Sequence, residues 1–137
     1  MPVGEKLWEE KGKTIGHSIK SVGPEGIRFE QTFVTEVKGF GRFPSGTNEG
    51  TIEGVQGLDG GVSGIGQGMC TTVDGDIGTW KVYFFGKIEG GKSRSVNIAR
   101  MESASGKIAW MKGLVVWMEG VLDLKTMELA DTGYEWK

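Results

Sequence analysis

The chain has 137 residues, a formal net charge of -2, and 25 glycines against 3 prolines. This length suits one domain over residues 1–137, whose core can bury roughly two-thirds of the unfolded surface. The basic residues are scattered, so a nucleic-acid partner, which would need a basic stripe, is not expected. The single cysteine, Cys70, excludes an internal disulfide and a cysteine-based zinc site, and it suits a reducing compartment.

The first residues, MPVGEKLWEEKGK, are charged where a signal peptide would need an apolar run. No stretch approaches the ~18 apolar residues of a membrane-spanning helix. We therefore expect a cytoplasmic protein with no membrane partner. Residues 5–10 predict a short N-terminal helical turn, whose Leu7 and Trp8 cover part of the fold.

Alternation of polar and apolar residues, typical of half-buried strands, begins at Thr14. Residues 14–22 and 26–38 are separated by the turn signal Gly23-Pro24, and the second of these segments alternates most regularly. After a bend, residues 47–56 predict a third strand weakened by glycine. The side chains expected to face inward from the first two strands are Ile15, His17, Ile19, Phe29, Gln31 and Phe33.

The central stretch, residues 57–88, predicts a β-hairpin around Asp74-Gly75, because this dipeptide favours a two-residue type I′ turn. That loop length pairs Met69 with Trp80 and Gly66 with Tyr83. It also gives the hairpin one large apolar inner face. On the other face, aromatic rings cover glycines, as curved sheets require.

Two further segments complete the predicted sheet. Residues 92–102 predict another strand, and residues 108–124, the most apolar run, predict two strands or one bent strand buried on both sides. Residues 126–137 close the chain. Eight or nine short strands with turn residues between them favour a sandwich or a barrel. The glycine content favours closure, so we predict an all-β fold, a small antiparallel β-barrel of about eight strands.

Several short motifs then resemble those of the small calycin-like barrels grouped with allene oxide cyclase. The motifs are GTNEGTIEG, the GxGQG strand, DGDIGTW, GLVVWMEG and DTGYEW. The resemblance implies a barrel that holds a small apolar ligand or intermediate, in a family many of whose members have no assigned activity. It transfers no catalytic residue to this chain.

The sequence offers only poor matches to the motifs for phosphate, calcium or transition-metal binding. The GxGxG glycines of residues 64–68 lie within a strand, whereas phosphate-binding loops connect a strand to a helix. Asp74-Gly75-Asp76 lacks the later ligands of a calcium loop. The lone histidine has no partner for a usual metal site. We therefore predict no cofactor and no metal, and catalytic residues remain unassigned.

One pattern points to a ligand. Three polar residues, His17, Gln31 and Gln67, interrupt faces that are otherwise apolar. Buried polar groups need partners, so these side chains either bond to one another and to buried water or orient a ligand in an apolar cavity. The predicted ligand-binding residues are His17, Phe29, Gln31, Gln67, Met69, Trp80 and Phe84.

Three functions remain open from the sequence. The first is binding of a small hydrophobic or aromatic molecule in the barrel interior. The second is a cyclase or isomerase that uses the same cavity, where shape and water exclusion can act without a motif. The third is an interaction module without a ligand, a homo-oligomer formed through an exposed aromatic face that includes Tyr83 and Phe85.

Overall fold

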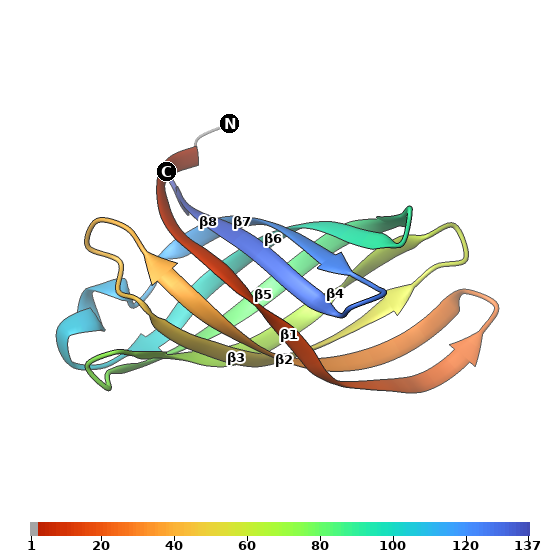
Figure 1. Cartoon of the computed structure of the whole chain (residues 1–137), viewed down its shortest axis with the longest axis horizontal. Coiled ribbons are helices and arrows are strands. Elements are labelled where there is room, and N and C mark those ends of the chain that lie inside the picture. Colours follow the sequence, from red (N-terminus) through yellow and green to blue (C-terminus); the bar gives the residue numbers. More distant parts are fainter. Residues whose placement is uncertain (1–2) are drawn as a thin grey trace.

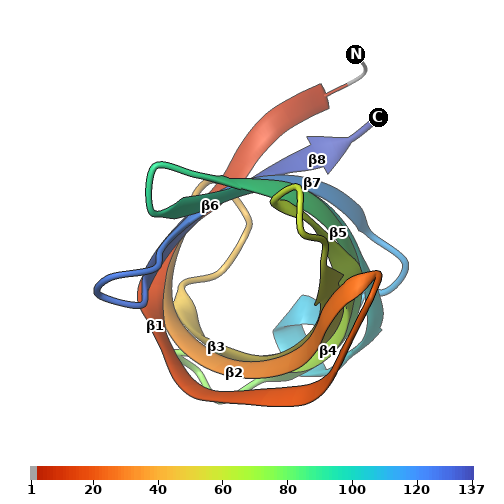
Figure 2. The same ribbon diagram turned by 90° about the vertical axis from the view of Figure 1, so that its right-hand side faces the viewer.

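The computed structural model describes residues 3–137, which form one closed barrel of eight strands, each antiparallel to its neighbours. Strands follow one another around the barrel in chain order, and β8 pairs with β1 (Figures 1 and 2). The predicted antiparallel β-barrel is therefore confirmed. The strands are β1 (Val3–Gly23), β2 (Gly26–Gly39), β3 (Gly46–Gln56), β4 (Gly61–Thr72), β5 (Ile77–Glu89), β6 (Lys92–Ala104), β7 (Val115–Asp123) and β8 (Glu128–Trp136).

The predicted N-terminal helical turn is wrong, because residues 5–10 belong to β1. A segment this short cannot offset the cost of helix nucleation. As a strand it pairs on both sides: Glu10 lies opposite Val37 of β2 and Asp131 of β8. A register irregularity before Trp8 accompanies the burial of two consecutive side chains, Leu7 and Trp8.

The β4–β5 hairpin forms, but its predicted register is wrong by one residue. Thr71 pairs with Ile77, and Thr72 N–H donates to the Asp76 carbonyl at 2.9 Å. The loop therefore has three residues rather than two. Gly75 N–H donates to the Thr72 carbonyl, and Gly75 has φ 88°, so the turn needs a left-handed backbone at this glycine and not at Asp74.

This shift of one residue reverses which side chains of β4 face the interior. Met69 lies opposite Thr79 and Gly66 opposite Val82, so the glycines of β4 point inward. Aromatic rings cover Gly64 and Gly68, but the rings belong to Phe84 and Trp80, and Gly66 lies against Ile52 and Val82 instead. The aromatic residues that we expected over them, Tyr83 and Phe85, are instead exposed on the outer surface.

One end of the barrel, which we call the closed end, is covered by the 3-10 helix η1 (Gly106–Met111) and by the β2–β3 loop (Figure 1). Residues 108–111 were expected in a strand, but Gly106 and Gly113 have positive φ and bound a helical turn. Ile108 and Met111 of η1 are buried. Within residues 3–137, no helix has the length and apolar character needed to cross a membrane.

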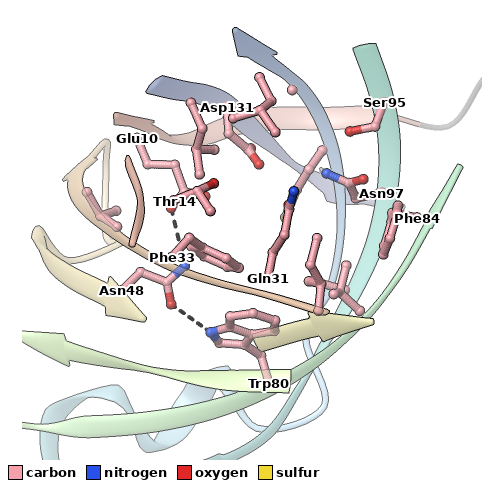
Figure 3. Close-up of a pocket in the computed structure, with 18 of the residues that line it drawn as sticks. Glu10, Thr14, Gln31, Phe33, Asn48, Trp80, Phe84, Ser95, Asn97 and Asp131 are labelled. Carbon is pink, nitrogen blue, oxygen red and sulfur yellow. Dashed lines mark hydrogen bonds between the residues drawn. The ribbon is translucent and has the colours of Figure 1, made fainter. Parts of the chain in front are cut away.

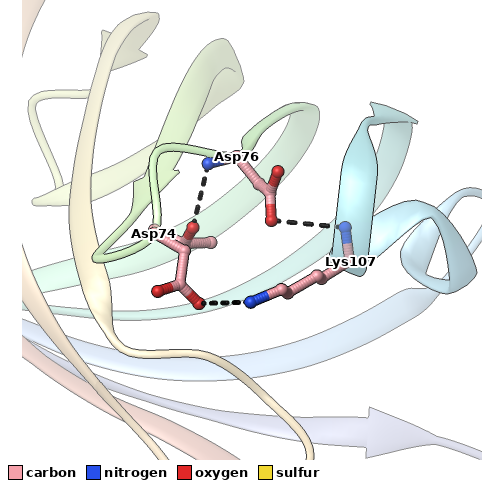
Figure 4. Close-up of polar contacts among 4 residues, drawn as sticks. Asp74, Asp76 and Lys107 are labelled. Carbon is pink, nitrogen blue, oxygen red and sulfur yellow. Dashed lines mark hydrogen bonds and ion pairs between the residues drawn. The ribbon is translucent and has the colours of Figure 1, made fainter.

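Helix η1 is attached to the β4–β5 hairpin by polar contacts (Figure 4). The Asp76 carboxylate accepts a hydrogen bond from Lys107 N–H at 3.2 Å, and Lys107 Nζ lies 3.5 Å from an Asp74 carboxylate oxygen. Gly106 has φ 55°, and a side chain there would overlap the Asp76 carboxylate. The hairpin loop thus positions the helix over the barrel end.

The opposite end, which we call the open end, carries the β1–β2, β3–β4, β5–β6 and β7–β8 turns and faces the viewer in Figure 2. The β1–β2 hairpin extends past β8, since β8 pairs with β1 only between Val3 and Lys13. Its apolar side chains lie in solvent: Ile15, Ile19 and Val22 are all more than half exposed.

Candidate ligand-binding cavity

The barrel encloses a cavity of about 390 Å³ that all eight strands line. Its aromatic lining residues are Trp8, Phe29, Phe33, Phe43, Trp80 and Phe84. Figure 3 shows part of this lining. Phe33 and Trp80 lie on one side of the space, and Asp131, Ser95 and Asn97 lie on the other. A concave space whose surface is mostly apolar, with polar groups at particular places, is the usual form of a small-molecule site.

The glycines of β3 and β4 keep this space open. A Cβ atom at Gly50 or Gly68 would overlap the Trp80 indole, and one at Gly64 would approach the Phe84 ring to 2.8 Å. The rings therefore lie against the bare backbone of the wall instead of crossing the interior. Larger residues at the glycine positions would push the rings into the cavity.

A chain of hydrogen bonds crosses the floor of the cavity from Trp8 to Trp80. The Glu10 carboxylate accepts from Trp8 Nε1 at 3.1 Å, from Asn48 Nδ2 at 3.2 Å and from the Thr35 hydroxyl. Asn48 Oδ1 in turn accepts from Trp80 Nε1 at 2.7 Å. Glu10 is only 4% exposed, so these donors replace the water it would otherwise bind. The network fixes the orientation of both indole rings.

A second polar group lies on the neighbouring wall. Asp131 of β8 is directly opposite Glu10 in the β1–β8 ladder. Burial, and secondarily the charge of Glu10, raises the pKa of Asp131 well above its usual 3.8. The Asp131 Oδ1 and Asn97 Oδ1 atoms are buried without a hydrogen-bond partner among the described residues. Asn97 Oδ1 is an acceptor, and Asp131 Oδ1 is an acceptor when the carboxyl group is ionised.

The predicted site residues are divided between the two surfaces of the barrel. Phe29, Gln31, Trp80 and Phe84 line the cavity, and His17 lines it near the open end with its side chain largely exposed. His17 is therefore not the buried core residue that the alternation indicated, because register shifts interrupt β1 on both sides of it.

Gln67 and Met69 do not line the cavity, which corrects their predicted inward direction. Both side chains lie on the outer surface, and Met69 is 37% exposed. The cause is the three-residue hairpin loop, which turns the odd-numbered residues of β4 outward.

Five polar residues of the cavity were not predicted from the sequence: Glu10, Asn48, Ser95, Asn97 and Asp131. Glu10 lies in the segment predicted as a helical turn, and Asn48 lies near the start of the predicted third strand, whose inward face the sequence did not identify. The other three, Ser95, Asn97 and Asp131, alternate with outward residues in strands that we had located correctly but had not assigned to a face. Polar residues at the inward positions of a strand are the signal for such groups, and this signal can be used only once the inward face of each strand is known.

Other chemistry has little support in the part of the chain that the structure describes. Among residues 3–137, no three His, Cys, Asp or Glu side chains gather as a metal ion would require. Cys70 is half-buried beside Gly78, and burial raises the pKa of its thiol, which lowers its reactivity as a nucleophile.

The fold and the cavity define the chain as a closed eight-stranded antiparallel β-barrel with a ligand-sized interior. No protein-family model matches the sequence, and neither does any curated protein. The fold matches a β-barrel-like protein from Acinetobacter baumannii, with a TM-score of 0.80, 13% identity, and coverage of 100% of this chain and 98% of that one.

Two further solved structures share the fold. A protein with unknown function from Clostridium acetobutylicum has a TM-score of 0.77 and 12% identity, covering 96% of each chain. A protein from Penicillium herquei described as an enzyme has a TM-score of 0.69 and 20% identity, covering 98% of this chain and 96% of that one. At these identities the likeness shows the fold alone.

Proposed function

We propose that the protein binds a small hydrophobic or aromatic molecule inside the barrel. The observation that carries this proposal is the cavity of about 390 Å³, whose lining is mainly apolar and includes six aromatic residues. The resemblance to calycin-like barrels agrees with such a role. A cytoplasmic location and the absence of a cofactor remain predictions from the sequence.

Binding can be tested with N-phenyl-1-naphthylamine, an apolar probe that is neutral at pH 7 and fluoresces in dry sites. We expect saturable enhancement of its fluorescence, with energy transfer from Trp80 in the cavity wall. The cavity-filling variant Ala99→Phe should lose about tenfold or more in affinity, because Ala99 lines the cavity.

The control is Ile98→Phe, which places the same phenylalanine side chain one residue away on the outer surface, where Ile98 is 42% exposed. It should bind the probe like the parent. Circular dichroism establishes that both variants fold, and Gln31→Phe provides a second filling variant. Equal affinity in the parent and in both filling variants would contradict interior binding.

A cyclase or isomerase acting in the same cavity is the alternative. Helix η1 closes one end, so a bound intermediate would be shielded from water on that side. Liquid chromatography coupled to mass spectrometry, applied to small molecules released from purified protein, distinguishes the two functions, because isomers of equal mass differ in retention time. A binding protein releases one compound unchanged after incubation, whereas an isomerase yields a second compound of equal mass.

Self-association is a second candidate, favoured by one outer surface. Ile65, Tyr83, Ile98, Trp117 and Tyr134 form a continuous row across β4–β8, which we call the outer apolar row. Tyr83 is 62% exposed. The proposed occupant is a second copy of the chain.

Charge supports that choice of occupant. The outer apolar row meets Glu53 of β3 at one end, and Lys81 and Arg100 lie in the next row of β5 and β6. Two copies related by a twofold axis can therefore pair opposite charges around an apolar centre. We expect a dimer in sedimentation, converted to a monomer by Tyr83→Glu but not by Val34→Glu on β2. A parent that is monomeric across the micromolar range would contradict this.

A further inference from the structure

We propose that the ligand is a primary amine, whose ammonium group binds the polar wall formed by Asp131, Ser95 and Glu10 while its apolar body lies against the aromatic rings. This inference rests on the proposed interior binding and narrows its ligand class. Figure 3 shows the polar wall above the aromatic residues.

The cavity lining carries negative charge without a compensating base. Two carboxyl groups, Glu10 and Asp131, face the interior from adjacent strands, and none of the described lining residues is Lys or Arg. His17 is the nearest candidate for a positive charge, but it lies toward the open end and is largely exposed. The two carboxyl groups disfavour an anionic ligand at this wall, so the wall favours a cation or a neutral donor.

The polar groups form one row across four strands. Glu10 pairs with Asp131, Asp131 with Gly120, and Gly120 with Ser95. In this row Gly120 leaves a notch between two oxygen-bearing side chains. A Cβ atom built at Gly120 would lie 3.5 Å from Asp131 Oδ2 and 3.7 Å from Ser95 Oγ. A small group seated over Gly120 therefore reaches both oxygens.

The polar wall contains oxygen atoms that receive no hydrogen bond from the described residues. Asn97, 9% exposed and two residues along β6 from Ser95, has an orphan Oδ1 atom, and so does Asp131. A primary ammonium carries three N–H donors and no acceptor. It can satisfy several acceptors at once, whereas a hydroxyl offers one donor. This difference favours the amine over an alcohol of the same shape.

The opposite wall suits the remainder of a cationic ligand. Phe33 and Trp80 stack with their ring centroids 6.0 Å apart, and both rings line the cavity. Aromatic faces attract cations and pack flat apolar groups. In addition, an ammonium beside Asp131 relieves the repulsion between its carboxyl group and that of Glu10.

The test compares three probes that share a naphthalene body: 2-(1-naphthyl)ethylamine, 2-(1-naphthyl)ethanol and 3-(1-naphthyl)propanoate. Isothermal titration calorimetry on the full chain at pH 7 should give the amine about tenfold or more higher affinity than the alcohol, since its hydrogen bonds are charge-assisted. The propanoate should bind most weakly.

Asp131→Asn should remove the preference for the amine and leave the affinity for the alcohol within about twofold. The control Glu119→Gln removes a carboxylate from the outer surface next to the same wall and should keep the preference. A second variant, Gly120→Ala, fills the notch at ordinary contact distances and should weaken amine binding most.

Proton release gives an independent readout. The titratable lining groups around the site are Glu10, His17, Cys70 and Asp131. Because the pKa of Asp131 is raised, a bound ammonium that ionises it expels a proton. Calorimetry in buffers of different ionisation enthalpy, repeated across a pH series, should detect this release with the amine but not with the alcohol or in Asp131→Asn.

The outcomes separate the two proposals. Equal affinity for amine and alcohol, tightest binding of the propanoate, or an amine preference that survives Asp131→Asn would each overturn the ammonium assignment while interior binding stands. If neither these probes nor N-phenyl-1-naphthylamine binds, the proposed interior binding fails, and the ammonium assignment fails with it.

Discussion

The two ends of this barrel are built from the same strands but differ in how much they bury. At the closed end, Met111 and Val116 are 0% and 1% exposed. At the open end, Leu58 is 83% exposed and Val22 74%. The closed end therefore supplies much of the packing energy, whereas the open end leaves the cavity accessible to a ligand. Binding regions are commonly drawn from the less stable parts of a fold.

The largest expected effect comes from the closed end. Met111→Ala should lower the free energy of unfolding by about 2–5 kcal/mol, because it opens a void in a fully buried cluster. The matched truncation Leu58→Ala should change it by less than about 0.5 kcal/mol. Urea unfolding measures both. Similar losses at the two sites would show that the ends do not differ in packing.

The next effect concerns the glycine wall that bounds the cavity. Gly68→Ala should cost about 1–3 kcal/mol, because the added Cβ overlaps both the Glu49 carbonyl and the Trp80 ring. Gly16→Ala is the control toward the open end, where the Cβ would meet only Thr32, at 3.8 Å. Thermal melts compare them. If Gly68→Ala melts at the same temperature as the parent, the backbone and the Trp80 ring can shift to accommodate the added methyl group at little cost in free energy.

A smaller effect follows from the buried carboxyl group of the cavity. The folded-state pKa of Asp131 is raised, so the folded state binds more protons than the unfolded chain between the two pKa values. Stability should therefore fall as pH rises from about 4, by at most about 1.4 kcal/mol per pH unit. In Asp131→Asn this part of the slope should disappear. An unchanged slope would place its origin in another group.

The smallest effect is expected at the mouth of the cavity. His17→Ala should alter the free energy of unfolding by less than about 0.5 kcal/mol, because the side chain is largely exposed. Chemical unfolding of the variant beside the parent provides the measurement. A loss above about 1 kcal/mol would return His17 to the core position that its flanking isoleucines indicated.

Strand positions were predictable from the sequence because alternation and turn residues are local signals. Phe29 and Gln31 were correctly assigned to one inward face of β2 on that basis. The faces of β4 were not predictable in the same way. Asp74-Gly75 fits loops of two or three residues, and the choice between them decides whether Met69 or Gly68 points inward.

The polar residues of the candidate site could not be predicted from local sequence patterns, for a different reason. Glu10 is buried only because donors from three other positions, Trp8, Thr35 and Asn48, converge on it. Such satisfaction depends on strands distant in sequence, so a glutamate in a charged segment resembles a surface residue until the barrel is assembled.

The pairing of Glu10 with Asp131 also has a consequence for the order of folding. Every other ladder joins strands that follow one another in the chain, whereas β1 and β8 are separated by almost its whole length. Closing that seam carries the largest loop entropy, and the two carboxyl groups become neighbours only when it closes. A molecule bound between these two carboxyl groups would therefore stabilise the β1–β8 ladder after it has formed. It would slow the opening of the ladder more than it would speed its formation.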